Sequence, residues 1–230
     1  AAAAAILFAA GVKLFWFALG GGLGAVGVWL LLVVVGYNGS RIEMWKNPWA
    51  DPGDKGYQIV QSLYAVASGG LSGLGFGMSR QKFAYLPEEQ NDYIFSIVCE
   101  EMGFIGAGII IALFALLVIR GYWLALHARD RFGALTIVGI TTLMAVQVFL
   151  NIAVVTNLIP STGIALPFFS YGGTALVIQL AEMGIVLSIS RQIPAPPEPA
   201  KKPLTRAEKK ALKKAKKAEA KAAKAAEKAE

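Results

Sequence analysis

The chain has 230 residues, of which 56% are hydrophobic and 16% are charged, and its mean hydropathy is positive. Because a soluble domain usually carries about 25% charged residues, this composition argues against a soluble enzyme. The formal net charge of +7 is concentrated at one end, since residues 191–230 hold 13 of the 22 Lys and Arg and residues 1–190 carry a net charge of −1. This distribution excludes a basic nucleic-acid-binding body, and the single Cys99 excludes a disulfide-rich secreted scaffold.

The first residues are not typical of a signal peptide. No cationic region precedes the apolar stretch and no cleavage-site pattern follows it. The chain also starts with Ala rather than Met, so we expect it to begin within a longer protein, inside or beside a helix.

Four apolar stretches are long enough to cross a membrane as helices, which takes about 20 residues each. Their only charged residues are Glu100 and Glu101 in the second stretch and Glu182 in the fourth. We therefore predict an all-α, polytopic membrane protein with four transmembrane helices. The predicted spans are residues 15–35, 93–119, 133–155 and 171–189.

Lys and Arg near the ends of the spans predict the orientation. Arg120, Arg129 and Arg131 lie between the second and third spans, and the basic C-terminal tail follows the fourth. Because cytoplasmic loops are enriched in Lys and Arg, we expect both segments on the cytoplasmic face. Residues 36–92 and 156–170 would then be outer loops.

Within the first outer loop, residues 57–79 are uncharged but are not predicted to span the membrane. They include five glycines, and the apolar residues Ile59, Leu63 and Val66 fall on one helical face. We expect an amphipathic helix at the membrane surface, followed by a glycine-rich turn. Because such backbone at membrane depth needs protein or a wet cavity around it, the turn indicates a groove open to the outer face.

The tail, residues 191–230, is predicted to have two parts. Five prolines between residues 194 and 203 are typical of a stiff, extended spacer. Residues 207–230 consist almost entirely of Ala, Lys and Glu and offer no apolar face, so a solvated, partly helical arm is expected. This arm either meets anionic lipid head groups or binds a partner protein.

Polar side chains gather at residues 79–95, just before the second span. Arg80 and Lys82 are suited to a pyrophosphate, Arg as a two-pronged donor and Lys as a point charge. Their alternative role is to reach lipid head groups. Gln81 and Glu88 add hydrogen-bonding groups, although a loop carboxylate such as Glu88 is often only solvated. A substrate with a charged or sugar-like head and an apolar tail would find partners here.

Asp92 stands immediately before the second span and has two interpretations. As an N-cap it would accept hydrogen bonds from the first turn of the helix, which stabilises a helix by about 1 kcal/mol. As a general base it would sit where lipid meets water, with a pKa that burial and nearby cations can adjust. The two roles are compatible.

The remaining polar residues of the spans have more ordinary explanations. Glu100, Glu101 and Glu182 are costly within a membrane, so they mark a cavity, a relay or an interhelical hydrogen bond. Gln147, Asn151 and Asn157 are interpreted as hydrogen-bonding links between helices.

The second outer loop ends in a turn that opens the last span. Two prolines and three glycines in residues 160–173 predict a bent entry, and Ser170, Tyr171 and Gly172 are candidates for holding a polar head group. A plain helix-entry turn is the alternative. No metal cluster is predicted, because the only histidine, His127, lies in the cytoplasmic loop without a second His or Cys nearby.

Five sequence blocks, in this order, resemble the SEDS family of bacterial membrane proteins (FtsW, RodA and SpoVE). The motifs NPWADP and SRQK, the second followed by YLPE, resemble the division and sporulation members more than RodA. Two positions depart from the family pattern: Thr162, where many FtsW proteins have Lys, and Glu182, where an apolar or small residue is usual. The blocks are residues 47–52, 56–62, 79–95, 100–106 and 166–173.

The resemblance implies a bundle of about ten transmembrane helices, of which this chain is the C-terminal portion. It also implies a glycosyltransferase that polymerises peptidoglycan glycan strands from lipid II in the plasma membrane during cell division or sporulation. The implied partner is a class B penicillin-binding protein, among other division proteins. Asp92 corresponds to the essential outer-loop aspartate of the family, and Lys82, Glu88 and the turn at residues 170–173 fall on its motif positions. A divalent cation, Mg²⁺ or Mn²⁺, could screen the pyrophosphate, but the sequence shows no defined site for it.

Two other functions are compatible with the sequence. A lipid II transporter would also use intramembrane carboxylates and a midplane cavity. A division scaffold would recruit a synthase through its helix faces and its tail. The concentration of reactive side chains at the outer face favours chemistry over transport.

Overall fold

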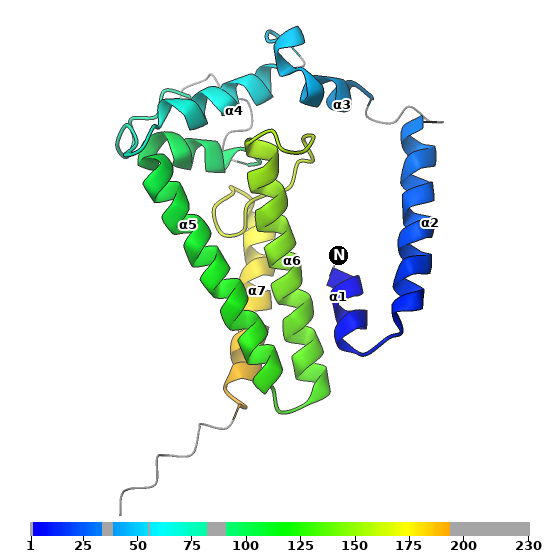
Figure 1. The fold of residues 1–230 in the computed structure, drawn as a ribbon. Helices are drawn as coiled ribbons and strands as arrows, with labels where there is room; N and C mark the ends of the chain where they lie inside the picture. Colours follow the sequence, from blue (N-terminus) through cyan, green and yellow to red (C-terminus); the bar gives the residue numbers. More distant parts are fainter. Residues whose placement is uncertain (1, 34–38, 55, 82–90, 194–230) are drawn as a thin grey trace, which may run out of the picture. The chain divides into compact units, whose positions relative to one another are not determined.

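The computed structural model describes residues 2–33, 39–54, 56–81 and 91–193, and all of them belong to one compact unit. Within these ranges the regular structure is entirely helical (Figure 1). The elements are α1 (Ala2–Ala9), α2 (Leu14–Val33), α3 (Gly39–Lys46), the 3₁₀ helix η1 (Pro48–Ala50), α4 (Tyr57–Ser68), α5 (Ile94–His127), α6 (Arg131–Val155) and α7 (Gly173–Ser190). From residue 194 onwards, the predicted tail lies outside the described residues.

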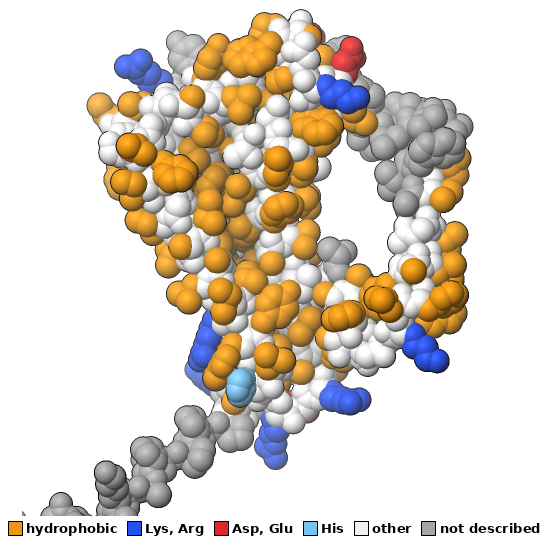
Figure 2. All heavy atoms as spheres, in the orientation of Figure 1, with side chains coloured by type: hydrophobic (Ala, Val, Ile, Leu, Met, Phe, Trp, Pro, Cys, Tyr) orange, Lys and Arg blue, Asp and Glu red, His pale blue; other side chains and the backbone are white. Residues whose placement is uncertain are grey.

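Three of the described helices, α5, α6 and α7, are long and apolar enough to cross a membrane. Helix α2 coincides with the predicted first span, and its first part, Leu14–Gly24, is apolar. Figure 2 shows hydrophobic side chains covering the lengths of the helices, with basic side chains near their ends. The prediction of an all-α membrane fold is confirmed.

Helices α5 and α6 run side by side and enclose the main apolar core (Figure 1). Their close approach depends on Gly121, because a Cβ there would lie 2.4 Å from the hydroxyl oxygen of Thr141. At the next residue of each helix, the hydroxyl groups of Tyr122 and Thr142 are 2.8 Å apart and form a hydrogen bond. Helix α6 covers the predicted span 133–155, and it begins two residues earlier with Asp130 accepting a capping hydrogen bond from the Gly133 amide.

Helix α5 differs from the predicted second span in its end and in its continuity. It continues to His127, so Arg120 lies inside the helix, with its guanidinium 4.1 Å from the centre of the Trp123 ring. It is also broken at Gly103, where φ is 66° and ψ is −170°. The break divides α5 into an arm, residues 94–102, which runs beside α4, and a shaft, residues 104–127, which runs beside α6 (Figure 1).

The glycine-rich turn, residues 69–77, pairs with the backbone groups that the break in α5 releases. Because a helix interrupted at one residue loses bonds on both sides of it, those donors and acceptors need other partners. The turn supplies four: Phe104 N–H donates to Gly70 O (2.9 Å), Ile105 N–H to Leu71 O (3.2 Å), Leu74 N–H to Glu100 O (3.0 Å) and Gly75 N–H to Glu101 O (3.0 Å). The predicted turn is present, and it is part of the α5 structure.

Helix α4 has the predicted amphipathic character over Tyr57–Ser68, but its buried face is rotated relative to the predicted one. Ile59 is buried as expected, whereas Leu63 and Val66 are only half-buried. The buried positions also include Ser62, whose hydroxyl donates to the carbonyl oxygen of Val155 at 3.0 Å. This bond ties α4 to the last residue of α6.

Replacing Ser62 with Ala should lower the free energy of unfolding by about 1–2 kcal/mol, because the fully buried hydroxyl donates a hydrogen bond to the Val155 carbonyl oxygen. Ser68→Ala on the same helix is the matched control, since its hydroxyl bonds only to the Ala65 carbonyl one turn earlier and the side chain is exposed. Thermal unfolding of the detergent-purified protein measures both. Equal unfolding temperatures for the two variants would contradict the predicted anchor.

Candidate functional site

Asp92 is half-buried and lies in a turn just before α5. The helix begins at Ile94, its N-cap residue is Tyr93, and no side chain caps it. The interpretation of Asp92 as an N-cap is therefore wrong, because the turn carries the chain two residues past the aspartate before helical geometry starts.

The backbone of Asp92 is held in place by Asn151 from α6. The Asn151 side chain is 1% exposed, and its amide nitrogen donates to the carbonyl oxygens of Asp92 at 2.7 Å and Ile164 at 2.8 Å. One buried side chain thus joins the segment before α5 to the second outer loop. Asn151, which was predicted to link two helices, instead links α6 to two loop segments.

Ser170 makes a second connection between the same two segments. Its hydroxyl donates to the carbonyl oxygen of Asn91 at 2.6 Å and accepts from the amide of Leu166 at 2.7 Å. Because both hydrogen bonds are to backbone groups, this geometry fixes the residue next to Asp92. The predicted contact of Ser170 with substrate stays a prediction.

The second outer loop also lies against the Asp92 carboxylate. A Cβ placed on Gly163 would be 3.3 Å from Asp92 Oδ2, and Gly163 has a φ of 67°, which side chains rarely adopt. Burial raises the pKa of the phenol of the next residue, Tyr93, above 10.0, so this side chain stays neutral at physiological pH. The Asp92 carboxylate therefore lies beside the backbone of the second outer loop.

Helix α3 belongs to the first outer loop and is hydrogen-bonded to the second outer loop. The indole nitrogen of Trp45 donates to Asn157 O at 3.1 Å, and the Asn157 side-chain amide donates back to Trp45 O at 3.3 Å. Arg41 adds a bond from Nη1 to the carbonyl oxygen of Ser161 at 3.3 Å. These reciprocal bonds restrain the loop that carries Ile164 and Gly163.

A second group of predicted site residues, Arg80 and Gln81, is bound to the arm of α5. The carboxylate of Glu100 accepts from the Ser79 hydroxyl and from the backbone amides of Arg80 and Gln81. Arg80 is exposed at its side chain and Gln81 is half-buried. Lys82 and Glu88, the two other predicted contacts in this loop, lie outside the described residues.

The turn before α7 holds Tyr171 and Gly172. Tyr171 is 80% exposed, and Gly172 is the N-cap of α7 without a side-chain hydrogen bond. The turn is bent at Phe168, where φ is 64°, and the Phe168 amide donates to Gln179 Oε1 at 2.9 Å. Sequence analysis missed Gln179; its one available signal was a polar side chain within an apolar span.

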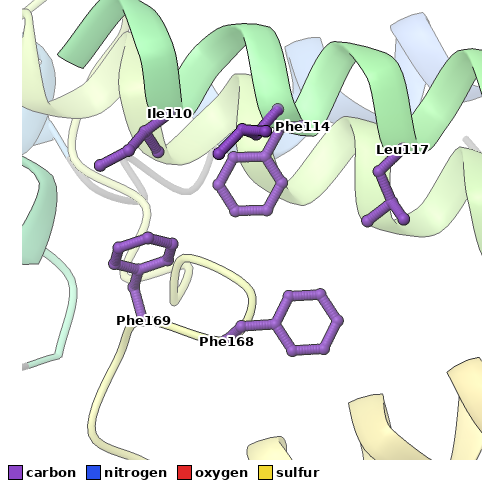
Figure 3. Close-up of a pocket in the computed structure, with 6 residues that line it drawn as sticks. Ile110, Phe114, Leu117, Phe168 and Phe169 are labelled. Carbon is purple, nitrogen blue, oxygen red and sulfur yellow. The ribbon is translucent and has the colours of Figure 1, made fainter. Parts of the chain in front are cut away.

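An apolar pocket of about 200 Å³ lies between this turn and the shaft of α5. Figure 3 shows Phe169 pointing toward Ile110 and Phe114 of the helix, and Phe168 extending on the side of Leu117. No polar side chain lines it, so it suits a hydrocarbon chain better than a sugar. The lining residues are Ile110, Leu113, Phe114, Leu117, Phe168 and Phe169.

The site therefore has three described parts. Asp92 and the second outer loop are joined by Asn151 and Ser170, Arg80 and Gln81 are joined to Glu100, and the apolar pocket lies beneath the turn before α7. The arm of α5 connects the first two parts, because Asp92 precedes it and Glu100 lies within it. Among the described residues, no three His, Cys, Asp or Glu side chains are grouped so that they could hold a metal ion.

Comparison with protein families decides the classification. Residues 1–194 match the family model for the cell cycle proteins FtsW, RodA and SpoVE. The chain belongs to this family. The SEDS resemblance of the sequence is thereby confirmed, and FtsW/RodA/SpoVE proteins provide the relevant comparisons for the site.

Curated members of the FtsW/RodA/SpoVE family align with most of the chain. Stage V sporulation protein E of Bacillus subtilis is 50% identical over 186 residues, which cover 81% of this chain and 51% of the relative. A probable peptidoglycan glycosyltransferase FtsW of Geobacter sulfurreducens is 44% identical over 192 residues, covering 84% of this chain and 52% of the relative. The chain thus spans about half the length of these relatives.

A solved structure shares the fold. It is described as "Structural coordination of polymerization and crosslinking by a peptidoglycan synthase complex", and its matching chain is 29% identical with a TM-score of 0.65. The match covers 83% of this chain and 53% of the other. The all-helical arrangement is therefore that of a FtsW/RodA/SpoVE protein.

Proposed function

We propose that this chain is part of a peptidoglycan glycosyltransferase that polymerises lipid II into glycan strands. The observation that carries the proposal is the placement of Asp92, a half-buried carboxylate whose backbone is fixed by Asn151 and which borders Gly163 in the second outer loop. A general base needs this kind of restrained position. Relatives named as probable peptidoglycan glycosyltransferases support the same activity.

In the proposed reaction, the 4-hydroxyl of the acceptor GlcNAc attacks the anomeric carbon of the lipid-linked MurNAc of the growing chain. Asp92 takes the hydroxyl proton as the new glycosidic bond forms. The bond from the anomeric carbon to the pyrophosphate oxygen breaks, and undecaprenyl pyrophosphate leaves with the bonding electrons. Arg80 and Lys82 stabilise the negative charge of the leaving pyrophosphate.

The remaining predicted contacts bind the two ends of the substrate. Gln81, Glu88, Tyr171 and Gly172 offer hydrogen-bonding groups to sugars and pyrophosphate. The apolar pocket beside Phe168 would take part of an isoprenoid chain, because all six lining side chains are apolar.

A divalent cation is a separate element of the proposal. Mg²⁺ or Mn²⁺ would screen the pyrophosphate charge when bound. The described residues provide no cluster of three metal-binding side chains, so they do not fit a protein-held ion, and the reaction above uses no metal step.

We further propose the location and partners of the intact protein. Three apolar helices in the described part support the plasma membrane, and the family supports a place at the division septum, with the basic tail in the cytoplasm. A class B penicillin-binding protein is the proposed transpeptidase partner. The similarity to a chain of a peptidoglycan synthase complex supports this partner.

Full-length protein carrying this chain, reconstituted with its penicillin-binding partner and given purified lipid II, should produce glycan polymer that is visible on gels and sensitive to a muramidase. The transporter alternative predicts movement of lipid II across vesicle membranes without polymer. Folded protein that moves lipid II and makes no polymer would refute the proposed activity.

A further inference from the structure

Glu100 is a buried carboxylate with three partners from one short segment. The residue is 1% exposed and lies on the arm of α5. Its Oε2 accepts from the Ser79 hydroxyl at 2.5 Å and from the Gln81 amide at 3.3 Å, and its Oε1 accepts from the Arg80 amide at 3.0 Å. Because an isolated buried carboxylate is strongly unfavourable, these three bonds are what allow Glu100 to be buried here.

The segment leading to Ser79 is packed against α5 at several points. A Cβ on Gly69 would lie 1.9 Å from the carbonyl oxygen of Cys99, and one on Gly73 would lie 2.1 Å from that of Glu101. The glycine-rich turn is also hydrogen-bonded to the backbone around Gly103. The chain therefore reaches Glu100 in a fixed path, and the carboxylate fixes its next three residues.

The neighbouring residue shows that this arrangement is specific to Glu100. The Glu101 side chain is half-buried, its Oε1 is buried, and that atom forms no hydrogen bond within the described part of the chain. Two adjacent carboxylates on one arm thus have different surroundings, and one of them holds residues 79–81.

We infer that Glu100 is a positioning residue that holds Arg80 and Gln81 in the orientation needed to bind the pyrophosphate and sugar of the substrate. The inference rests on the proposed glycosyltransferase function. Arg80 is exposed and its backbone amide is bound to Glu100 Oε1, so the carboxylate acts on substrate only through that backbone.

A neutral amide cannot reproduce this arrangement. Each oxygen of Glu100 faces a backbone N–H, of Arg80 on one side and of Gln81 on the other. In Glu100→Gln, the NH₂ group would oppose one of these donors in either orientation of the amide. The variant therefore loses at least one bond at almost unchanged side-chain volume.

Glu100→Gln should raise the KM for lipid II by about tenfold or more, with a smaller change in kcat, because hydrogen bonds to a charged group are among the stronger ones. Glu101→Gln is the matched control and should change neither constant. A Glu100 that served only to stabilise the fold would lower the active fraction and hence the apparent kcat, with KM unchanged. That result would overturn the inference.

A double-mutant cycle tests whether Glu100 acts through Arg80. Arg80→Ala should weaken lipid II binding in the wild-type protein and have much less effect in the Glu100→Gln background, since the arginine is already misplaced there. Additive effects of the two substitutions would contradict the inference.

Hydrogen–deuterium exchange separates this inference from the proposed function. The amides of Arg80 and Gln81 should exchange faster in Glu100→Gln than in Glu101→Gln, whether or not the protein polymerises lipid II. Faster exchange in a Glu100→Gln protein whose wild type makes no polymer would support the positioning role of Glu100 and reject the glycosyltransferase. Unchanged exchange together with an unchanged KM would reject the positioning role alone.

Discussion

Asp92→Asn should reduce glycan polymerisation by about 10²–10⁴-fold, which is the usual contribution of a general base. The amide has nearly the same size as the carboxylate but cannot accept the acceptor hydroxyl proton. The anchoring bond from Asn151 goes to the backbone carbonyl of Asp92, so the substitution leaves it intact. We therefore expect loss of activity without loss of fold.

Polymer formed from lipid II by full-length protein, together with the thermal unfolding temperature of each variant, measures this effect. Asp54→Asn is the matched control, because Asp54 is an exposed carboxylate in the same outer segment. The control should polymerise at the wild-type rate. If Asp92→Asn also did so, with normal expression, Asp92 would not be the base.

The long helices could be predicted from sequence because their signal is local. A run of about 20 apolar residues is sufficient to predict a spanning helix, and α6 and α7 follow the predicted runs within about two residues at each end. The break in α5 could not be predicted in this way. Gly103, Gly106 and Gly108 all lie in the same apolar run, and only Gly103 meets the glycine-rich turn that makes a break favourable.

The surroundings of Glu100 could not be predicted from the sequence for the same reason. Counted along one straight helix, Glu100 and Glu101 are two adjacent carboxylates within an apolar run. The break at Gly103 places both on the arm, where Glu100 receives hydrogen bonds from residues 79–81. The groups that make burial of this carboxylate possible therefore come from a loop, which a count along the helix does not show.

The candidate site could be predicted in its residue types but not in its connections. Asp92 was identified by its place before a span and by the family resemblance. Asn151 and Ser170 are recognisable in the sequence as polar residues. Their side chains, however, bond to the backbone carbonyls of Asp92 and Asn91, which lie 59 and 79 positions earlier in the chain. Every residue has such a carbonyl, so sequence carries no signal for which one is used.

Gly103→Ala should destabilise the protein by about 3 kcal/mol or more, because it combines two unfavourable effects. With φ at 66° and ψ at −170°, the backbone occupies a region that is essentially restricted to glycine. The added Cβ would also lie 2.3 Å from the Gly73 nitrogen and 2.6 Å from the Leu71 carbonyl oxygen. Both are backbone atoms held by hydrogen bonds, since the Gly73 N–H donates to Gly69 O and the Leu71 carbonyl accepts from the Ile105 N–H of α5, so neither can move aside cheaply.

Gly108→Ala provides the matched control on the same helix. No atom lies within 4 Å of a Cβ at Gly108, and its conformation is helical, so alanine there should be neutral or slightly stabilising. Thermal unfolding and the yield of folded protein in detergent measure both variants. Equal unfolding temperatures would mean that α5 can straighten without cost. The arm would then not be fixed by the glycine-rich turn, and the path that brings residues 79–81 to Glu100 would lose its physical basis.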